Sequence, residues 1–131
     1  MKTDIEIKDD IYDYLKDSRL TMAINGNLYK RLRPTNSTLE DVVISVLANS
    51  NGQIQEAFVN VNIYVKDNLV EGQYEEDTIR CRLLCRIASE VLELGRGDGY
   101  RFTLNSQRVL KVEGRNEHFI NNKLLYQQNN E

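Results

Sequence analysis

Apolar residues near the start of the chain recur with the period of an α-helix. The positions that share one face of this helix are Ile7, Ile11, Tyr14 and Leu15, with charged residues between them. This pattern predicts an amphipathic helix over residues 3–17. Thr3 or Asp4 has a side chain that can cap its N-terminus.

A second helical pattern begins at Asp77 or Thr78. Its wide apolar face predicts a well-buried helix and comprises Ile79, Leu83, Leu84, Ile87, Ala88, Val91 and Leu94. Gly95 is suited to end this helix. The glycine-rich residues 95–99 are predicted to be the most flexible stretch of the chain.

Alternation of apolar and polar residues gives the clearest strand. Its two faces hold Val59, Val61, Ile63 and Val65 on one side and Phe58, Asn60, Asn62 and Tyr64 on the other. Such alternation indicates that one face is buried and the other is more polar. A β-branched run at 41–47 and a polar turn at 48–53 precede it, so the two strands are expected to form an antiparallel hairpin.

The remaining predicted strands are bounded by turn residues and cover 28–33, 100–104, 108–112 and 118–126. Residues 105–107 are predicted as the turn between two of them, and 66–76 as a polar acidic link. The whole chain, 1–131, is predicted to be a single α+β domain with element order α-β-β-β-α-β-β-β. Two amphipathic helices would cover one face of a mainly antiparallel sheet, and the polar tail 127–131 would be disordered.

The composition excludes several classes of protein. The 17 basic and 20 acidic residues are evenly mixed and give a net charge of −3. A dedicated nucleic-acid binder usually shows a basic stripe, which this chain lacks. No apolar run approaches the roughly 18 residues of a membrane span, and no secretory signal opens the sequence, so folding in a reducing cytoplasm is expected.

Few residues could carry catalysis or bind a metal. Cys81 and Cys85 are four residues apart on the predicted helix, which is neither the C-x-x-C spacing of zinc or redox sites nor the spacing of a disulfide. They are predicted to pack as small hydrophobic side chains. His118, the single histidine, is predicted to lie at the surface at the start of a strand. We therefore expect no catalytic residue, no metal and no cofactor.

The uncharged face of the clearest strand is the best candidate for a contact surface. Phe58, Asn60, Asn62 and Tyr64 are unusual for a solvent-exposed sheet face, because aromatic residues are enriched in the cores of interfaces. They either pack beneath a helix or meet another subunit. A small basic cluster at Lys30, Arg31 and Arg33 is either a solvated strand edge or a set of salt bridges across a subunit contact.

The order of several residues resembles that of a known family. Ile11-Tyr12, Leu15, Ser18-Arg19-Leu20, the run from Ile24 to Tyr29, and Pro34 lead into the strand at 42–47. This is similar to the start of the phage tail-completion (tail-terminator) proteins. The strand at 59–65, the polar link, the helix at 78–94 and the closing strands continue the resemblance over nearly the whole chain.

The resemblance implies a non-enzymatic virion structural protein, made in the bacterial host cytoplasm. Such proteins form a ring, commonly a hexamer, that caps the tail tube and joins it to the head connector. DNA passes through the lumen without specific binding, which suits a chain without a basic stripe. Asn51, Gly52, Arg96 and Asp98 lie in loops that would reach the tube, the connector or the lumen.

Two other functions stay open at this point. The chain could be a small cytoplasmic protein–protein interaction module of an unrelated system, with the same fold. It could also be an enzyme that uses Cys81, Cys85 or His118, although no catalytic motif accompanies these residues.

Overall fold

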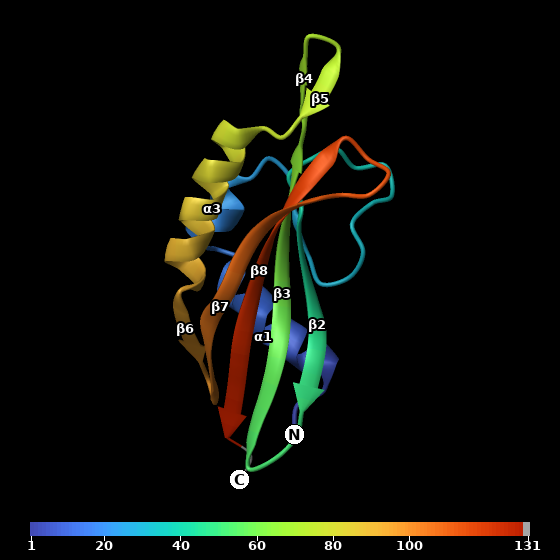
Figure 1. The fold of residues 1–131 in the computed structure, drawn as a ribbon. Helices are drawn as coiled ribbons and strands as arrows, with labels where there is room; N and C mark the ends of the chain where they lie inside the picture. Colours follow the sequence, from blue (N-terminus) through green and yellow to red (C-terminus); the bar gives the residue numbers. More distant parts are fainter. Residues whose placement is uncertain (130–131) are drawn as a thin grey trace.

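The structure is a computed structural model that describes residues 1–129 (Figure 1). Its elements are α1 (Asp4–Leu15), α2 (Arg19–Ala23), β1 (Leu28–Tyr29), β2 (Val42–Ser50), β3 (Ile54–Lys66), β4 (Asn68–Val70), β5 (Gln73–Glu75), α3 (Thr78–Leu92), β6 (Leu94–Gly97), β7 (Tyr100–Lys111) and β8 (Glu117–Asn129). Six strands form one sheet in the order β1-β2-β3-β8-β7-β6, and β4 pairs with β5 separately. Only the β1–β2 pair of the large sheet is parallel. The predicted α+β class with a mainly antiparallel sheet is confirmed.

The hydrophobic core lies between one face of the sheet and the helices α1 and α3 (Figure 1). The apolar face predicted for the first helix is confirmed by the burial of Ile7, Ile11 and Leu15. The sheet contributes the predicted inward residues of β3, which are Val59, Val61, Ile63 and Val65. Full burial of a side chain of this size contributes about 1.5–3 kcal/mol, so this layer contact accounts for much of the stability.

The helix starts follow from local side-chain chemistry. Thr3 Oγ1 accepts a hydrogen bond from the Glu6 amide at 3.2 Å, and the Glu6 carboxylate accepts one from the Thr3 amide at 3.0 Å. This reciprocal capping box confirms Thr3 as the N-cap of α1. Asp77 caps α3 by accepting a hydrogen bond from the amide of Arg80 at 3.1 Å.

The β2–β3 hairpin is longer than the sequence predicts. β2 continues to Ser50 and β3 begins at Ile54, so the turn shortens to residues 51–53. The predicted antiparallel pairing is confirmed by the register, in which Ile44 lies opposite Val61. A polar composition at 48–50 is compatible with strand because those residues lie at an exposed end of the sheet.

The predicted turn at 105–107 is wrong, because β7 is one continuous strand. Leu104 pairs with Leu124 and Ser106 pairs with Lys123, so Asn105 is an extra residue on β7. This is a β-bulge, which absorbs one residue and bends the strand without ending it. The short polar run at 105–107 therefore marks a bulge within β7 and not the predicted turn.

The predicted flexible loop at 95–99 is also wrong, as is the assignment of Gly95 as a helix cap. Leu94–Gly97 form β6, which pairs with β7 at the edge of the sheet. A Cβ added to Gly95 would lie 2.1 Å from Cζ of Phe102, and one added to Gly97 would lie 2.2 Å from Cε1 of Tyr100. Gly95 and Gly97 are needed because aromatic rings cover the backbone, and of the three glycines in 95–99 only Gly99 has a left-handed φ, of 77°.

Four further expectations are corrected. The link at 66–76 contains the hairpin β4–β5, and the strand predicted at 28–33 is paired only at Leu28–Tyr29. The apolar face predicted for the second helix is too wide, because Ile79, Leu83 and Leu94 are exposed. The tail predicted to be disordered from 127 continues β8 to Asn129 through pairing with β3, and residues 130–131 lie outside the described residues.

None of the helices formed by residues 1–129 has the length and apolar character needed to cross a membrane.

Candidate interaction surface

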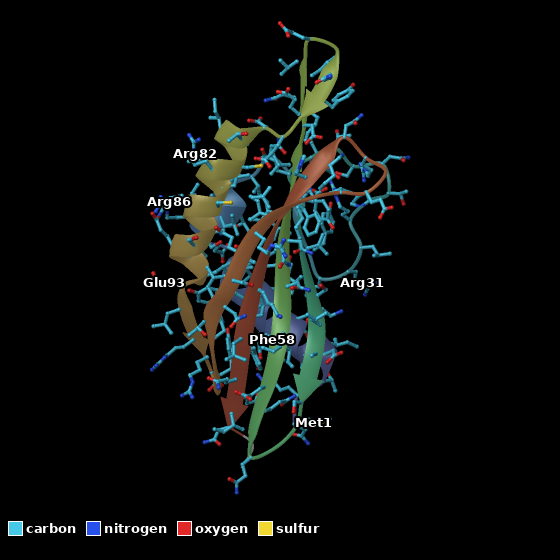
Figure 2. All side chains as sticks on the ribbon, viewed as in Figure 1. Met1, Arg31, Phe58, Arg82, Arg86 and Glu93 are labelled. Atoms are coloured by element: carbon cyan, nitrogen blue, oxygen red, sulfur yellow. The ribbon has the colours of Figure 1, made fainter. Side chains whose placement is uncertain are left out.

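The face of the sheet that points away from the core is the candidate interaction surface, called here the open face. It is formed by outward side chains of β3 and β8, namely Phe58, Asn60, Asn62, Tyr64, Phe119, Asn121, Lys123 and Leu125. In Figure 1, α1 lies behind the strands and the open face lies in front, and Phe58 is labelled on it in Figure 2. No helix within residues 1–129 packs on this face, so packing beneath a helix does not explain its composition.

An amide cluster occupies the middle of the open face. Nδ2 of Asn121 donates to Oδ1 of Asn60 at 3.1 Å and to Oδ1 of Asn62 at 2.7 Å. Asn62 and Asn121 are directly opposite each other across the β3–β8 pair. These bonds fix the orientation of the amides and leave the Nδ2 groups of Asn60 and Asn62 without an acceptor in the described part of the chain. The cluster can therefore donate hydrogen bonds to a partner.

Aromatic rings lie on either side of this amide cluster, and cations cover them. Tyr64 stacks on Phe119 with ring centres 5.8 Å apart, and the guanidinium of Arg33 lies 4.1 Å from the centre of the Tyr64 ring. At the other end, Nζ of Lys123 lies 4.4 Å from the centre of the Phe58 ring. Cation–π contacts of this kind are weak at exposed sites. Lys123 can thus leave Phe58 for a partner, whereas Arg33 is held in place.

Arg33 belongs to a buried ionic cluster. Its side chain is 9% exposed and binds Asp41 at 3.0 Å and Glu117 at 2.9 Å. Burial alone would lower the pKa of Arg33, but the hydrogen bonds to Glu117 and Asp41 outweigh it and raise the pKa above its ordinary value. The cluster joins the loop after β1 to the start of β8, so Arg33 has a structural role within the chain.

The other two members of the predicted basic cluster lie apart from Arg33. Nζ of Lys30 forms an ion pair with Asp9 at 2.9 Å and lies 4.7 Å from the centre of the Tyr12 ring. Arg31 is exposed and is labelled in Figure 2. The three basic residues therefore do not form one patch, and Arg31 is the member best placed to meet a partner.

The remaining predicted contact residues gather at one end of the sheet. Asn51 and Gly52 form the β2–β3 turn, and Arg96 and Asp98 lie in β6 and the turn that follows it; both turns lie at the lower end of the sheet in Figure 1. All four are exposed. Arg96 lies opposite Arg101 across β6 and β7, and like charges in that position repel.

A shallow hollow of about 430 Å³ adjoins this end and includes Arg96, Tyr100, Arg101 and Gln128 in its lining. The two arginines give it a cationic rim. A partner carboxylate placed there would relieve the repulsion between them.

The residues considered as candidates for catalysis or metal binding, Cys81, Cys85 and His118, pack within the fold. Burial raises the pKa of the Cys81 thiol to about 12 and also raises that of Cys85, so little reactive thiolate is present near neutral pH. His118 is not a surface residue as predicted, because it faces the core side of the sheet and its Nδ1 lies 2.7 Å from the buried Asp67. Within residues 1–129 no group of three or more His, Cys, Asp and Glu side chains could hold a metal ion.

Two exposed features were missed by the sequence reasoning. The first is the hairpin β4–β5, for which the available signal is a glycine, Gly72, between the short apolar run Leu69-Val70 and Tyr74. The second is the outward side of α3, where Ile79 and Leu83 were assigned to the core. A helix that is apolar over more than one stripe signals a second contact surface.

The comparisons with known proteins concern the fold. No protein-family model matches the chain, and no curated protein matches it in sequence. The fold is similar to that of a chain in the solved structure of the virion of a native gene transfer agent (GTA) particle, with a TM-score of 0.59 and 11% sequence identity. The match covers 95% of this chain and 95% of that chain.

Proposed function

We propose that this protein is a non-enzymatic structural subunit of a phage-like virion. The observation that carries the proposal is the fold shared with a chain of the gene transfer agent virion over 95% of both chains. Because the match extends over nearly the whole of both chains and not over one motif, the two proteins share the fold of an entire subunit.

The finer proposal is that copies of the chain form a ring that caps the tail tube and joins it to the head connector. The resemblance of residues 11–34 and of the later elements to tail-completion proteins supports this role. The open face supports it as well, because half-buried aromatic and amide side chains such as Phe58 and Asn60 have the composition of an interface core. A net charge of −3 suits a lumen through which DNA passes without being held.

The test is the mass of the assembled species in solution, combined with binding to tail tubes. Light scattering on the full chain over a range of concentrations is expected to give an oligomer of one defined size, and electron microscopy is expected to show a ring. The oligomer is expected to sediment with tubes assembled from the tube protein encoded in the same genomic neighbourhood. A chain that stays monomeric at high concentration and does not bind the tubes would overturn the proposal.

A further inference from the structure

The hairpin β4–β5, residues Asn68–Glu75 and called here the arm, stands apart from the sheet (Figure 1). Glu71 and Gly72 form its tip with φ of 49° and 81°, as a two-residue turn between twisted strands requires. An isolated two-stranded hairpin is only marginally stable in water. The arm therefore has a defined shape but gains little stability from the rest of its own chain.

The arm exposes apolar side chains and carries negative charge. Leu69 and Tyr74 are directly opposite each other on one face and are 62% and 54% exposed. The charged residues of the arm are Glu71 and Glu75, and neither forms an ion pair with any residue in the range 1–129. The arm has the composition of an anionic, partly apolar contact element.

The outward side of α3 has the complementary composition. Four of its exposed residues occupy positions i, i+3, i+4 and i+7, so they form one stripe, called here the outer stripe: Ile79, Arg82, Leu83 and Arg86. Ile79 and Leu83 are 78% and 48% exposed. Neither arginine forms an ion pair with another described residue, and both are labelled on the outside of the helix in Figure 2. The packing of α3 on the sheet uses a different stripe, which holds Cys81, Leu84 and Ala88.

We propose that the arm of one copy of this protein docks on the outer stripe of α3 of a second copy. Leu69 and Tyr74 would cover Ile79 and Leu83, and Glu71 at the tip would pair with Arg82 or Arg86. Glu75 lies on the other face of the hairpin, opposite Asn68, and would add to the negative charge of the arm without direct contact. The lengths agree, because a three-residue strand spans about 10 Å at 3.3–3.4 Å per residue. The outer stripe from Ile79 to Arg86 spans about 10 Å at 1.5 Å per residue.

The arm reaches another copy more readily than its own helix. Only Glu76 and Asp77 separate β5 from α3, and Figure 1 shows the arm projecting past the N-terminal end of that helix. Because the arm and the outer stripe are different surfaces, their contact is heterologous and repeats around a ring if the rotation closes. The inference rests on the proposed ring and names the contact that builds it.

Charge reversal on each side of the contact tests the inference in the full chain. We expect Glu71→Lys with Glu75→Lys to weaken self-association at least tenfold, and Arg82→Glu with Arg86→Glu to do the same. Sedimentation velocity measures the association, and circular dichroism checks that each variant is folded. The matched control for the arm variant is Asp17→Lys with Glu113→Lys, which makes the same charge change as that variant at exposed positions outside both surfaces and is expected to assemble like the wild type.

Mixing the two reversed variants gives the decisive result. In a 1:1 mixture, the Lys-bearing arm of one variant can dock on the Glu-bearing stripe of the other. The native arm of the second variant can likewise dock on the native stripe of the first, so the mixture is expected to assemble again. If the wild type assembles and both reversed variants assemble equally well, the arm–stripe contact is wrong and another surface makes the contact between subunits of the ring. If the wild type itself never assembles, both the ring and this contact are overturned.

Discussion

The ring of Phe102 lies directly over the backbone of Gly95, its partner across the β6–β7 pair. Any side chain at position 95 would occupy the space of that ring, which is buried in the core between the sheet and the helices. The contact explains why the edge strand β6 has a glycine at its second position and why a residue with a side chain cannot replace it.

We therefore predict that Gly95→Ala destabilises the protein by about 1–3 kcal/mol, the usual cost of overpacking a filled core. Gly52→Ala is the matched control, because its added Cβ would lie 3.6 Å from the nearest atom, an ordinary contact. Urea unfolding followed by circular dichroism measures both. Equal stability of the two variants would show that Phe102 moves aside at little cost.

Arg33→Met is predicted to destabilise the protein by about 3–5 kcal/mol, because it leaves the buried carboxylate of Asp41 without a cation and leaves Glu117 only the longer contact with Arg115, at 3.6 Å. Arg31→Met removes the same charge from an exposed position two residues earlier and is expected to change stability by less than about 0.5 kcal/mol. Denaturant midpoints compare the two variants. A similar midpoint for both would mean that the cluster is not held by Arg33.

The Cys81 thiol is predicted to resist alkylation in the folded protein. With its pKa raised from 9.0 to about 12, the thiolate fraction at pH 8 is about a thousandfold lower than in the unfolded chain. Iodoacetamide labelling with and without urea, read by mass spectrometry, gives the ratio of the labelling rates of the folded and unfolded chain at Cys81. The same sample gives this ratio at the less buried Cys85. Labelling of Cys81 at the unfolded rate would contradict its place in the core.

The same shift predicts a pH dependence of stability. The folded chain keeps the Cys81 proton at pH values where the unfolded chain has released it, so the thiol's contribution is complete below pH 9 and falls as the pH rises from about 9 toward 12. The measurement is the free energy of unfolding of the wild type minus that of Cys81→Ala at pH 8 and pH 10.5. The difference is expected to shrink at the higher pH; a constant difference would rule out this linkage.

Phe58→Asp on the open face is predicted to weaken self-association at least tenfold, which corresponds to about 1.4 kcal/mol, while the chain stays folded. The reason is that a carboxylate would be desolvated at the core of an interface. Leu32→Asp is the control, because Leu32 is 90% exposed and is not one of the residues that form the open face. Sedimentation velocity reads both variants, and an effect of Leu32→Asp as large as that of Phe58→Asp would count against the open face.

Local patterns predicted the parts of the fold that depend on local chemistry. The alternation from Phe58 to Val65 and the cap of the first helix, predicted at Thr3 or Asp4 and found at Thr3, needed no knowledge of distant residues. The role of Gly95 did depend on a distant residue, because only the placement of the Phe102 ring turns a glycine-rich segment into a strand.

The same distinction between local and distant contacts decides which parts of the candidate contact surface could be predicted. The strand pattern correctly separated Phe58 and Asn60 from the core, but it could not show that Arg33 is held by the distant Glu117. Ile79 and Leu83 were assigned to the core because periodicity reports an apolar stripe without saying which protein covers it. The arm was missed because three-residue strands are too short to show alternation.

The position of β8 between β3 and β7 sets the order of events during synthesis. Until residues 117–129 have been synthesised, β1–β3 and β6–β7 are two pieces that share no strand pairing within residues 1–129, and the edges of β3 and β7 are free. Such edges pair readily with those of other chains. The sheet can therefore be completed only once β8 has been synthesised, because β8 supplies the strand pairing to both pieces.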